Sequence, residues 1–182
     1  MTTVLVLIDL QNDYFPGGTM ELVGAQAAVA QATRLLDAFR ARAQPVVHVQ
    51  HIATRPGATF FLEGTAGADI HARVRPVAGE RVVAKHFPNS FRDTTLLADL
   101  RALGASKVLF AGMMTHMCVD TTIRAAADLG FQCALAHDAC ATRSLQFGGH
   151  TVDAKEVQLA YLAALNGSFA KVQSTEECLA TP

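Results

Sequence analysis

The chain has 182 residues, a length that suits one domain, and 51% of them are hydrophobic while 17% are charged. These proportions exclude a disordered chain and predict a single globular domain, residues 1–182, with a substantial core. The 15 basic and 16 acidic residues give a net charge of −1 without any cluster of Lys and Arg, which argues against a nucleic-acid partner and against a polybasic membrane anchor.

Apolar runs of strand length alternate along the chain with amphipathic runs of helical length. Six strands are predicted, at residues 4–8, 46–49, 82–84, 107–112, 131–136 and 169–172. Four helices are predicted, at residues 25–42, 95–103, 118–129 and 152–165. Strands that alternate with helices imply right-handed crossovers and a parallel sheet. The prediction is therefore an α/β fold, a doubly wound, open, parallel six-stranded sheet with helices on both faces, in a Rossmann-like three-layer α/β/α arrangement.

Residues 52–80 do not fit this alternation, because they carry six Pro and Gly residues and show little periodicity. A loop of this length inside a compact domain usually has a function. We expect it to be either an active-site lid or an assembly arm.

The compartment and the state of the cysteines follow from simple patterns. The longest apolar run near the N-terminus, Val4 to Ile8, is too short to span a bilayer and lacks the flanks of a signal peptide, so we expect a cytoplasmic protein with no membrane partner. The four cysteines are irregularly spaced and form no CxxC motif, so free thiols are expected. Cys133 is expected within a strand, and Cys140 in the loop after it, as the more exposed of the two.

Three reactive side chains are expected at the carboxyl ends of the strands, where sheets of this kind bind ligands. Asp9 follows the first strand, Lys85 ends the third, and Cys118 follows the fourth at the start of a helix. A thiolate is a nucleophile, a carboxylate can take the thiol proton, and a cation with a helix N-terminus is expected to lower the thiol pKa. Each residue alone is commonly structural, so the prediction of a catalytic site depends on their co-location.

Three motifs occur in a characteristic order. They are Ile8-Asp9-Leu10-Gln11-Asn12-Asp13, Val83-Ala84-Lys85 and Gly112-Met113-Met114-Thr115-His116-Met117-Cys118-Val119. In these motifs the chain resembles the isochorismatase-like cysteine hydrolase superfamily, to which nicotinamidase, N-carbamoylsarcosine amidase and ureidoacrylate amidohydrolase belong. The resemblance runs from about residue 3 to residue 175, essentially the whole chain.

The resemblance implies a catalytic triad of Asp9, Lys85 and Cys118, and a covalent acyl-cysteine intermediate that water hydrolyses. It implies a non-proline cis peptide between Met113 and Met114, with the backbone amides of Met114 and Cys118 as the oxyanion hole. A small-molecule substrate and a homo-oligomer, a dimer or larger, are implied as well. We therefore expect hydrolysis of a small amide or a related carbon–nitrogen bond.

One departure from the family concerns metal binding. Nicotinamidases carry an Asp-x-His pair and a later His that bind a divalent metal, whereas this chain has His48-Val49-Gln50-His51. Two His at this spacing point to opposite faces of a strand, so we expect no shared metal site and no cofactor. Whether His48 or His51 alone binds a metal stays open.

Six further residues are candidates for binding substrate. Phe15, Phe87 and Phe91 are candidates for an apolar pocket wall, with core packing as the alternative. Asn89 and His116 are candidates for binding a carbonyl or amide of the substrate, and Thr115 lies in the same turn as His116.

Two alternative functions stay open. Isochorismatase proper hydrolyses a vinyl ether and can work without the cysteine, in which case Asp9 would be essential and Cys118 dispensable. A non-catalytic small-molecule-binding α/β module would leave Cys118 unreactive, although no GxGxxG or GxxxxGK[ST] motif follows any strand to support a nucleotide-binding form.

Overall fold

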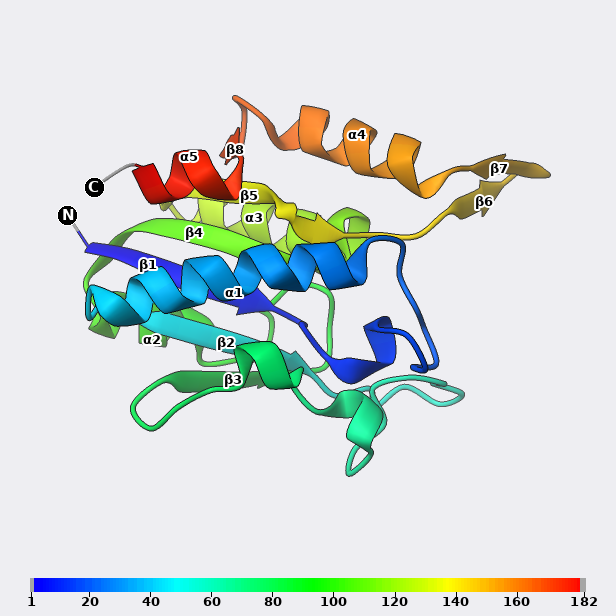
Figure 1. Cartoon of the computed structure of the whole chain (residues 1–182), viewed down its shortest axis with the longest axis horizontal. Helices are drawn as coiled ribbons and strands as arrows, with labels where there is room; N and C mark the ends of the chain where they lie inside the picture. The colour runs from blue at the N-terminus through cyan, green and yellow to red at the C-terminus, as the bar shows by residue number, and fades with distance from the viewer. Residues whose placement is uncertain (1, 181–182) are drawn as a thin grey trace.

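The computed structural model describes residues 2–180 and contains one parallel sheet of six strands between two layers of helices (Figure 1). The strands lie in the order β3-β2-β1-β4-β5-β8. Their bounds are β1 (Thr2–Ile8), β2 (Val46–His51), β3 (Arg81–Lys85), β4 (Ala105–Met113), β5 (Gln132–Ala141) and β8 (Lys171–Gln173). The predicted doubly wound α/β fold is confirmed, and β8 is the sixth predicted strand, shifted toward the C-terminus.

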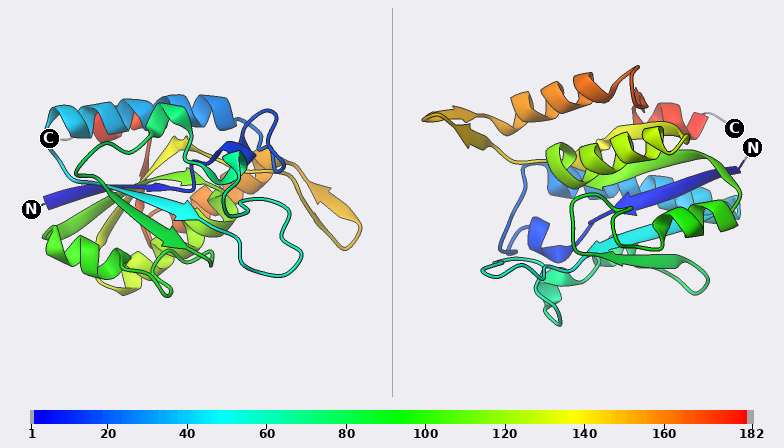
Figure 2. Two further views of the ribbon diagram at one scale, coloured as in Figure 1. Left: turned by 90° about the horizontal axis from the view of Figure 1, so that it is seen from below. Right: turned by 180° about the vertical axis from the view of Figure 1, so that it is seen from behind.

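The helices cover both faces of this sheet. Figure 2 (left) shows α1 (Ala25–Ala41) and α5 (Thr175–Ala180) on one side, and α2 (Leu96–Ala102) and α3 (Asp120–Asp128) on the other. A further helix, α4 (Ala154–Leu165), packs against α3 and β8. None of the helices in residues 2–180 is both long enough and apolar enough to cross a membrane.

β1 shows why the sheet is buried on both faces. Its side chains alternate, so that Leu5 and Leu7 join the core under α1 while Val4, Val6 and Ile8 join the core under α2 and α3. All five are at most 2% exposed. A continuously apolar strand of this kind is typical of the centre of a parallel sheet, and it places the end of β1 in the middle of the molecule.

Gly112 lets β4 pass close to the end of β1. Its φ is +141°, and a Cβ atom there would lie 2.0 Å from the carbonyl oxygen of Ile8. Any larger residue would push the two strands apart. The pairing of β4 with β5 also shifts register between Phe110 and Gly112, where β5 carries extra residues, and it resumes at Gly112 and Met113.

Two features beyond the predicted elements lie around β5. A short antiparallel hairpin, β6 (Leu145–Phe147) and β7 (His150–Val152), projects away from the body of the molecule (Figure 1). β5 itself is longer than predicted and includes Cys140, which is buried, whereas Cys133 is partly exposed. The expectation of an exposed Cys140 in a loop was therefore wrong, because the strand continues past the residues whose apolar pattern reveals it.

The segment of residues 52–80 carries two short 3-10 helices, η2 (Ala66–Ala68) and η3 (Ala72–Val74), and is fixed to the sheet at both ends. Near its start, the amide of Phe61 donates to Oδ2 of Asp13 over 2.6 Å. At its end, Glu80 accepts two hydrogen bonds from Arg40 of α1, and its Oε2 lies 2.8 Å from Nε2 of His48 of β2. The segment therefore runs from the carboxyl end of β2 back to the amino end of β3, and Phe61 fixes it beside η1 on the way.

Candidate active site

Asp9, Lys85 and Cys118 reach the same point from three different elements. Asp9 follows β1 directly and adopts φ = 49°, a left-handed conformation that is uncommon outside glycine and is often found at functional sites. Lys85 is the last residue of β3. Cys118 lies in η4 (Thr115–Val119), a π-helical turn between β4 and α3. The predicted helix at 118–129 thus begins as this wider turn, and α3 starts only at Asp120.

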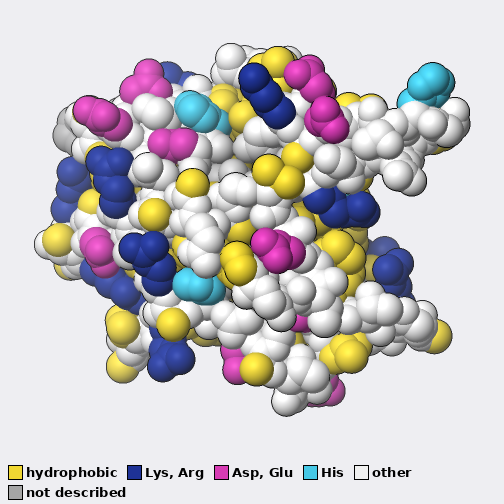
Figure 3. Space-filling model, turned by 45° about the vertical axis from the view of Figure 1, so that its right-hand side comes forward, with side chains coloured by type: hydrophobic (Ala, Val, Ile, Leu, Met, Phe, Trp, Pro, Cys, Tyr) yellow, Lys and Arg dark blue, Asp and Glu magenta, His cyan; other side chains and the backbone are white. Residues whose placement is uncertain are grey.

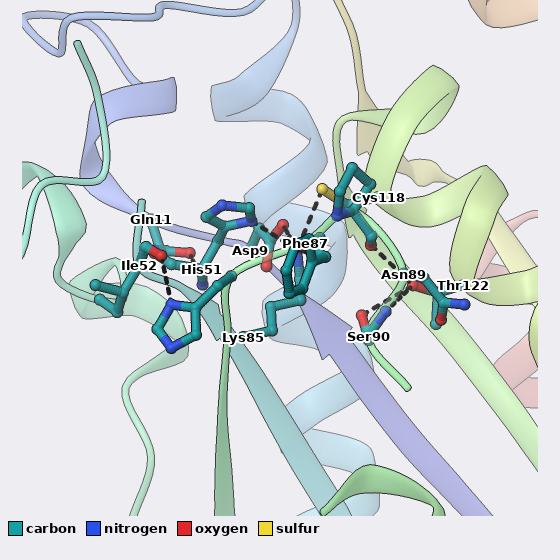
Figure 4. A network of polar contacts seen from close by, with 12 residues as sticks. Asp9, Gln11, His51, Ile52, Lys85, Phe87, Asn89, Ser90, Cys118 and Thr122 are labelled. Atoms are coloured by element: carbon teal, nitrogen blue, oxygen red, sulfur yellow. Dashed lines mark hydrogen bonds and ion pairs between the residues drawn. The ribbon is translucent and has the colours of Figure 1, made fainter. Parts of the chain in front are cut away.

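The three side chains are in contact in the interior (Figure 4). Lys85 Nζ lies 2.8 Å from Oδ2 of Asp9 and 3.2 Å from Sγ of Cys118. Asp9 and Lys85 are fully buried and Cys118 is 5% exposed. A buried carboxylate and a buried ammonium are costly unless they are paired, so this pairing is a specific feature of the fold.

The ionisation of these groups follows from burial and mutual charge. Burial alone would lower the pKa of Lys85, but the negative charge of Asp9 and the contacts with Asp9 and Cys118 outweigh it and raise the pKa above 10.5, so the ammonium persists. Burial, together with the charge of Asp9, raises the pKa of Cys118 above its ordinary 9.0 despite the opposing effect of Lys85. The expected lowering of the thiol pKa was therefore wrong, because burial and the charge of Asp9 outweigh the effect of Lys85.

His51, at the end of β2, is a fourth polar residue of this cluster. Its Nδ1 lies 2.9 Å from Lys85 Nζ. Ligand atoms of Asp9, His51 and Cys118 all lie within 4.8 Å of one another, which is the spacing of a cation site. The cation among them is the Lys85 ammonium itself. His48 turns instead toward Glu80, at 2.8 Å from its Oε2, so the two His do not converge, in agreement with their spacing.

An apolar cavity of about 420 Å³ opens above Cys118. Its walls come from η1 (Asn12–Tyr14), the end of β2, the 52–80 segment, the residues after β3, and η4. The lining residues are Tyr14, His51, Ala53, Thr54, Arg55, Ala58, Phe60, His86, Phe87, Pro88, Met114, Met117 and Cys118. Figure 3 shows this side of the molecule hollowed between the projecting hairpin and the lower lobe, with hydrophobic side chains in the hollow.

Of the six residues predicted to bind substrate, only Phe87 lines this cavity. Phe15 packs on the ring of His71, with 4.1 Å between the ring centroids, and Phe91 stacks on Phe131 at 6.4 Å. Phe15 and Phe91 therefore pack against other rings and do not line the cavity, as the alternative interpretation predicted.

The three polar candidates are engaged in local hydrogen bonds. Asn89 Oδ1 accepts from the amide of Phe91 over 2.9 Å. Thr115 Oγ1 donates to the carbonyl of Ala141 over 3.2 Å, and Nδ1 of His116 lies 2.6 Å from Oγ1 of Thr142. The bonds of Thr115 and His116 hold η4 against the end of β5 and the residue that follows it, and none of the three polar candidates lines the cavity.

The turn that was expected to form the oxyanion hole has the predicted backbone. The peptide bond between Met113 and Met114 is cis, as the resemblance implied. The carbonyl of Met114 accepts hydrogen bonds from the amides of Met117 and Val119. Met114 and Cys118 both line the cavity, whereas the role of their amides stays a prediction.

Sequence reasoning did not select Tyr14, Arg55 or Phe60 as cavity residues. Tyr14 ends a 3-10 helix that follows Asp9, and its ring is 1% exposed and lies 4.6 Å from that of Phe61. The other two come from the segment without periodicity. The sequence indicated Arg55 and Phe60 in one way only. A long loop beside predicted catalytic residues commonly supplies the walls of the site.

Comparisons with known proteins show what this chain is similar to. A family model described as the isochorismatase domain matches residues 3–177. An uncharacterised isochorismatase family protein of Bacillus subtilis is 46% identical over 179 residues, which cover 98% of this chain and 99% of that protein. A crystal structure from Oleispira antarctica, provisionally named an isochorismatase hydrolase, has a TM-score of 0.95 and 50% identity, with 98% of this chain and 96% of that chain covered. N-carbamoylsarcosine amidase from Thermoplasma acidophilum has a TM-score of 0.81 and 26% identity, with 97% and 98% covered.

Proposed function

Because this chain belongs to the isochorismatase family and is a hydrolase of that family, we propose that it hydrolyses a small amide or a related carbon–nitrogen bond through Cys118. The observation that carries the proposal is the contact of Lys85 with both Asp9 and Cys118 at the base of an apolar cavity. A structural relative that is named an amidase, and that spans nearly the same length, supports carbon–nitrogen chemistry.

In the first half of the proposed reaction, Asp9 takes the thiol proton while Cys118 Sγ attacks the carbonyl carbon of the substrate. The amides of Met114 and Cys118 hold the oxygen that becomes negative. The tetrahedral intermediate then collapses and its carbon–nitrogen bond breaks. The proton returns from Asp9 to the leaving nitrogen, which departs as ammonia or an amine and leaves an acyl-cysteine thioester.

In the second half, Asp9 takes a proton from water, which attacks the thioester carbonyl. The carbon–sulfur bond breaks, Asp9 returns its proton to Sγ, the acid is released, and the Cys118 thiol is restored. Lys85 keeps its charge throughout and stabilises negative charge on Sγ as it develops. Because the thiol pKa is raised, ionisation is coupled to attack, and Asp9 is the base that makes it possible.

The cavity indicates what the acyl part of the substrate is like. It is walled mainly by aromatic and aliphatic groups such as Tyr14, Phe60 and Phe87. Among the described residues that line it, Arg55 is the side chain with a permanent charge, and no carboxylate lines it. A compact, largely apolar acyl group that is neutral or anionic therefore fits better than a cationic one.

The test is ammonia release from a panel of small primary amides and ureido acids. Wild type and Cys133→Ala, which alters a thiol outside the cavity, should both release ammonia from at least one substrate. Cys118→Ala should lose at least about 10³-fold in rate while it keeps its fold. Hydrolysis of a vinyl ether, assayed in parallel, that survives in Cys118→Ala but not in Asp9→Asn would instead indicate vinyl-ether chemistry. No turnover, together with a Cys118 that no alkylating agent modifies, would indicate a binding module.

A further inference from the structure

Lys85 has more hydrogen-bond acceptors around it than it has hydrogens to donate. Its Nζ lies 2.8 Å from Asp9 Oδ2, 2.9 Å from His51 Nδ1, 3.1 Å from the carbonyl oxygen of Phe87 and 3.2 Å from Cys118 Sγ. An ammonium group carries three hydrogens. At any moment, therefore, one of these four acceptors lacks a hydrogen bond from Lys85.

Of these four acceptors, Sγ of Cys118 is the weakest when the site is at rest. A neutral thiol sulfur is a weaker hydrogen-bond acceptor than a carboxylate, a carbonyl oxygen or an imidazole nitrogen. Asp9 is charged, and the Phe87 carbonyl is fixed by the backbone. His51 is thus the one neutral side chain that accepts a hydrogen bond from Lys85. Without it, this hydrogen bond would be available to a Cys118 thiolate.

The orientation of His51 is set by its surroundings. Gln11 donates from Nε2 to the carbonyl of His51 over 2.8 Å and accepts from its amide over 2.7 Å. Since Lys85 can only donate, Nδ1 of His51 must be the acceptor, and the proton of the neutral ring lies on Nε2. Figure 4 shows the His51 ring beside Lys85, across from Cys118.

We propose that His51 is a positioning residue that competes with Cys118 for the hydrogens of Lys85 and so keeps the nucleophile protonated in the resting enzyme. The hydrogen moves to Sγ only as negative charge develops there during attack. Lys85 then stabilises the transition state more than the ground state, which is the condition for faster catalysis. The proposal rests on the nucleophilic role proposed for Cys118, but its test needs no substrate.

Other ionisable groups also act on His51 and Cys118. Asp9 follows β1, Tyr14 comes from η1, and Lys85 and His86 from the end of β3, while Arg55 comes from the 52–80 segment. His86 lines the same cavity, but its Nδ1 lies 2.8 Å from the carbonyl of Ile52 rather than near Lys85. A change at His86 therefore serves as the control for altered polarity and access.

The experiment measures the rate at which iodoacetamide, an uncharged reagent, alkylates Cys118, over a pH series and by mass spectrometry of its peptide. His51→Leu keeps bulk but removes the acceptor, and it should alkylate about tenfold faster at about pH 8, as expected for the redirection of one charge-assisted hydrogen bond. His51→Asn offers an amide oxygen where Nδ1 was, and it should stay near wild type. His86→Leu should also stay near wild type.

Equal alkylation rates in wild type and His51→Leu would overturn the proposal, and so would the same increase in His51→Asn or His86→Leu. A measurement on wild type alone covers the case in which the Leu variant does not fold. The ¹⁵N chemical shifts of the His51 ring should show Nδ1 without a proton and Nε2 with one at neutral pH. A proton on Nδ1 would overturn the proposal. Loss of turnover in Cys118→Ala is a separate result, so failure of the proposed function would be recognised independently.

Discussion

At the scale of single residues, Cys118 lies between a carboxylate and an ammonium that act on its pKa in opposite directions. Burial and Asp9 raise the pKa, and Lys85 lowers it. Asp9 thus has two effects of opposite sign on the reaction. It opposes free ionisation of the thiol, and in the proposed reaction it accepts the proton when the substrate is in place.

Replacement of Asp9 by Asn separates these two effects. The Asn side chain has no charge, so the thiol pKa should fall and Cys118 should be alkylated severalfold faster at a fixed pH near 8. It cannot act as a base, so amide turnover should fall by about 10²–10⁴. The measurement is a pH series of iodoacetamide labelling beside ammonia release, with the exposed Asp69→Asn as control. Labelling and turnover that decrease together would mean that Asp9 mainly holds the fold.

At this scale the convergence of these three residues was predictable, but their ionisation was not. Asp9, Lys85 and Cys118 meet because the carboxyl ends of parallel strands share one edge of the sheet. The sign of the thiol pKa shift depends on burial, which sequence spacing does not reveal. Tyr14, rather than the predicted Phe15, faces the cavity because a 3-10 helix turns successive side chains by about 120°.

At the scale of elements, Asp13 connects η1 to the wall of the cavity. Its carboxylate is 5% exposed and accepts from the amide of Phe61, and from Oγ1 of Thr19 over 2.9 Å. Gly67 packs directly against it, since a Cβ atom there would lie 2.2 Å from Oδ1. The 52–80 segment is therefore placed by one buried carboxylate next to the cavity residue Phe60.

Asp13→Ala should free this anchor. We expect a loss of about 1–3 kcal/mol in the free energy of unfolding, because a buried amide is left without its partner. We also expect a higher KM, because Phe60 loses its support. Urea unfolding and steady-state kinetics measure the two effects. Asp69→Ala, an exposed position on the same segment, should change stability by less than about 0.5 kcal/mol. A full KM effect in that control would contradict the role of Asp13.

Glu80 fixes the other end of this segment and makes stability depend on pH. Burial would raise the pKa of Glu80, but hydrogen bonds from Arg40, the amide of Val77 and His48 outweigh it and lower the pKa from 4.5 to about 2. A carboxylate whose pKa is lowered by folding stabilises the fold above its unfolded pKa. This stabilisation is lost as the pH falls from about 4.5 toward 2.

Glu80→Gln should therefore lower stability by about 2 kcal/mol at neutral pH and by much less near pH 2. Thermal unfolding across this pH range measures the difference, with the exposed Glu63→Gln as the matched control. A difference between wild type and Glu80→Gln that is constant with pH would show that shape, rather than charge, matters at this position.

Elements were predictable where apolar periodicity is strong. The strands of the central sheet fall at their predicted places because a continuous apolar run can only be buried on both faces. The β6–β7 hairpin was missed, because it is exposed and carries little apolar pattern. Its signal was the Gly148-Gly149 pair between short runs, which is typical of a tight hairpin turn. The 3-10 helices of the 52–80 segment have no such signal.

At the scale of the whole molecule, the expected homo-oligomer stays a prediction, and the hairpin is the surface on which to test it. Figure 1 shows β6 and β7 extending beyond the body of the molecule. Phe147 on the hairpin is 89% exposed, and Leu159 of α4 is 62% exposed. A two-stranded hairpin is only marginally stable in water, so an apolar surface from a second copy of the chain would stabilise it.

We propose that the chain self-associates through this hairpin and that Phe147→Ser weakens the association. Sedimentation velocity over a concentration series should show wild type as a dimer or larger, and Phe147→Ser shifted toward the monomer. The control is Val82→Ser, because Val82 is 48% exposed on β3, the strand at one edge of the sheet, so its loss removes apolar surface elsewhere. If Val82→Ser shifted the mass and Phe147→Ser did not, the association would lie at the β3 edge. A monomeric wild type would contradict the homo-oligomer itself and leave the hairpin exposed in solution.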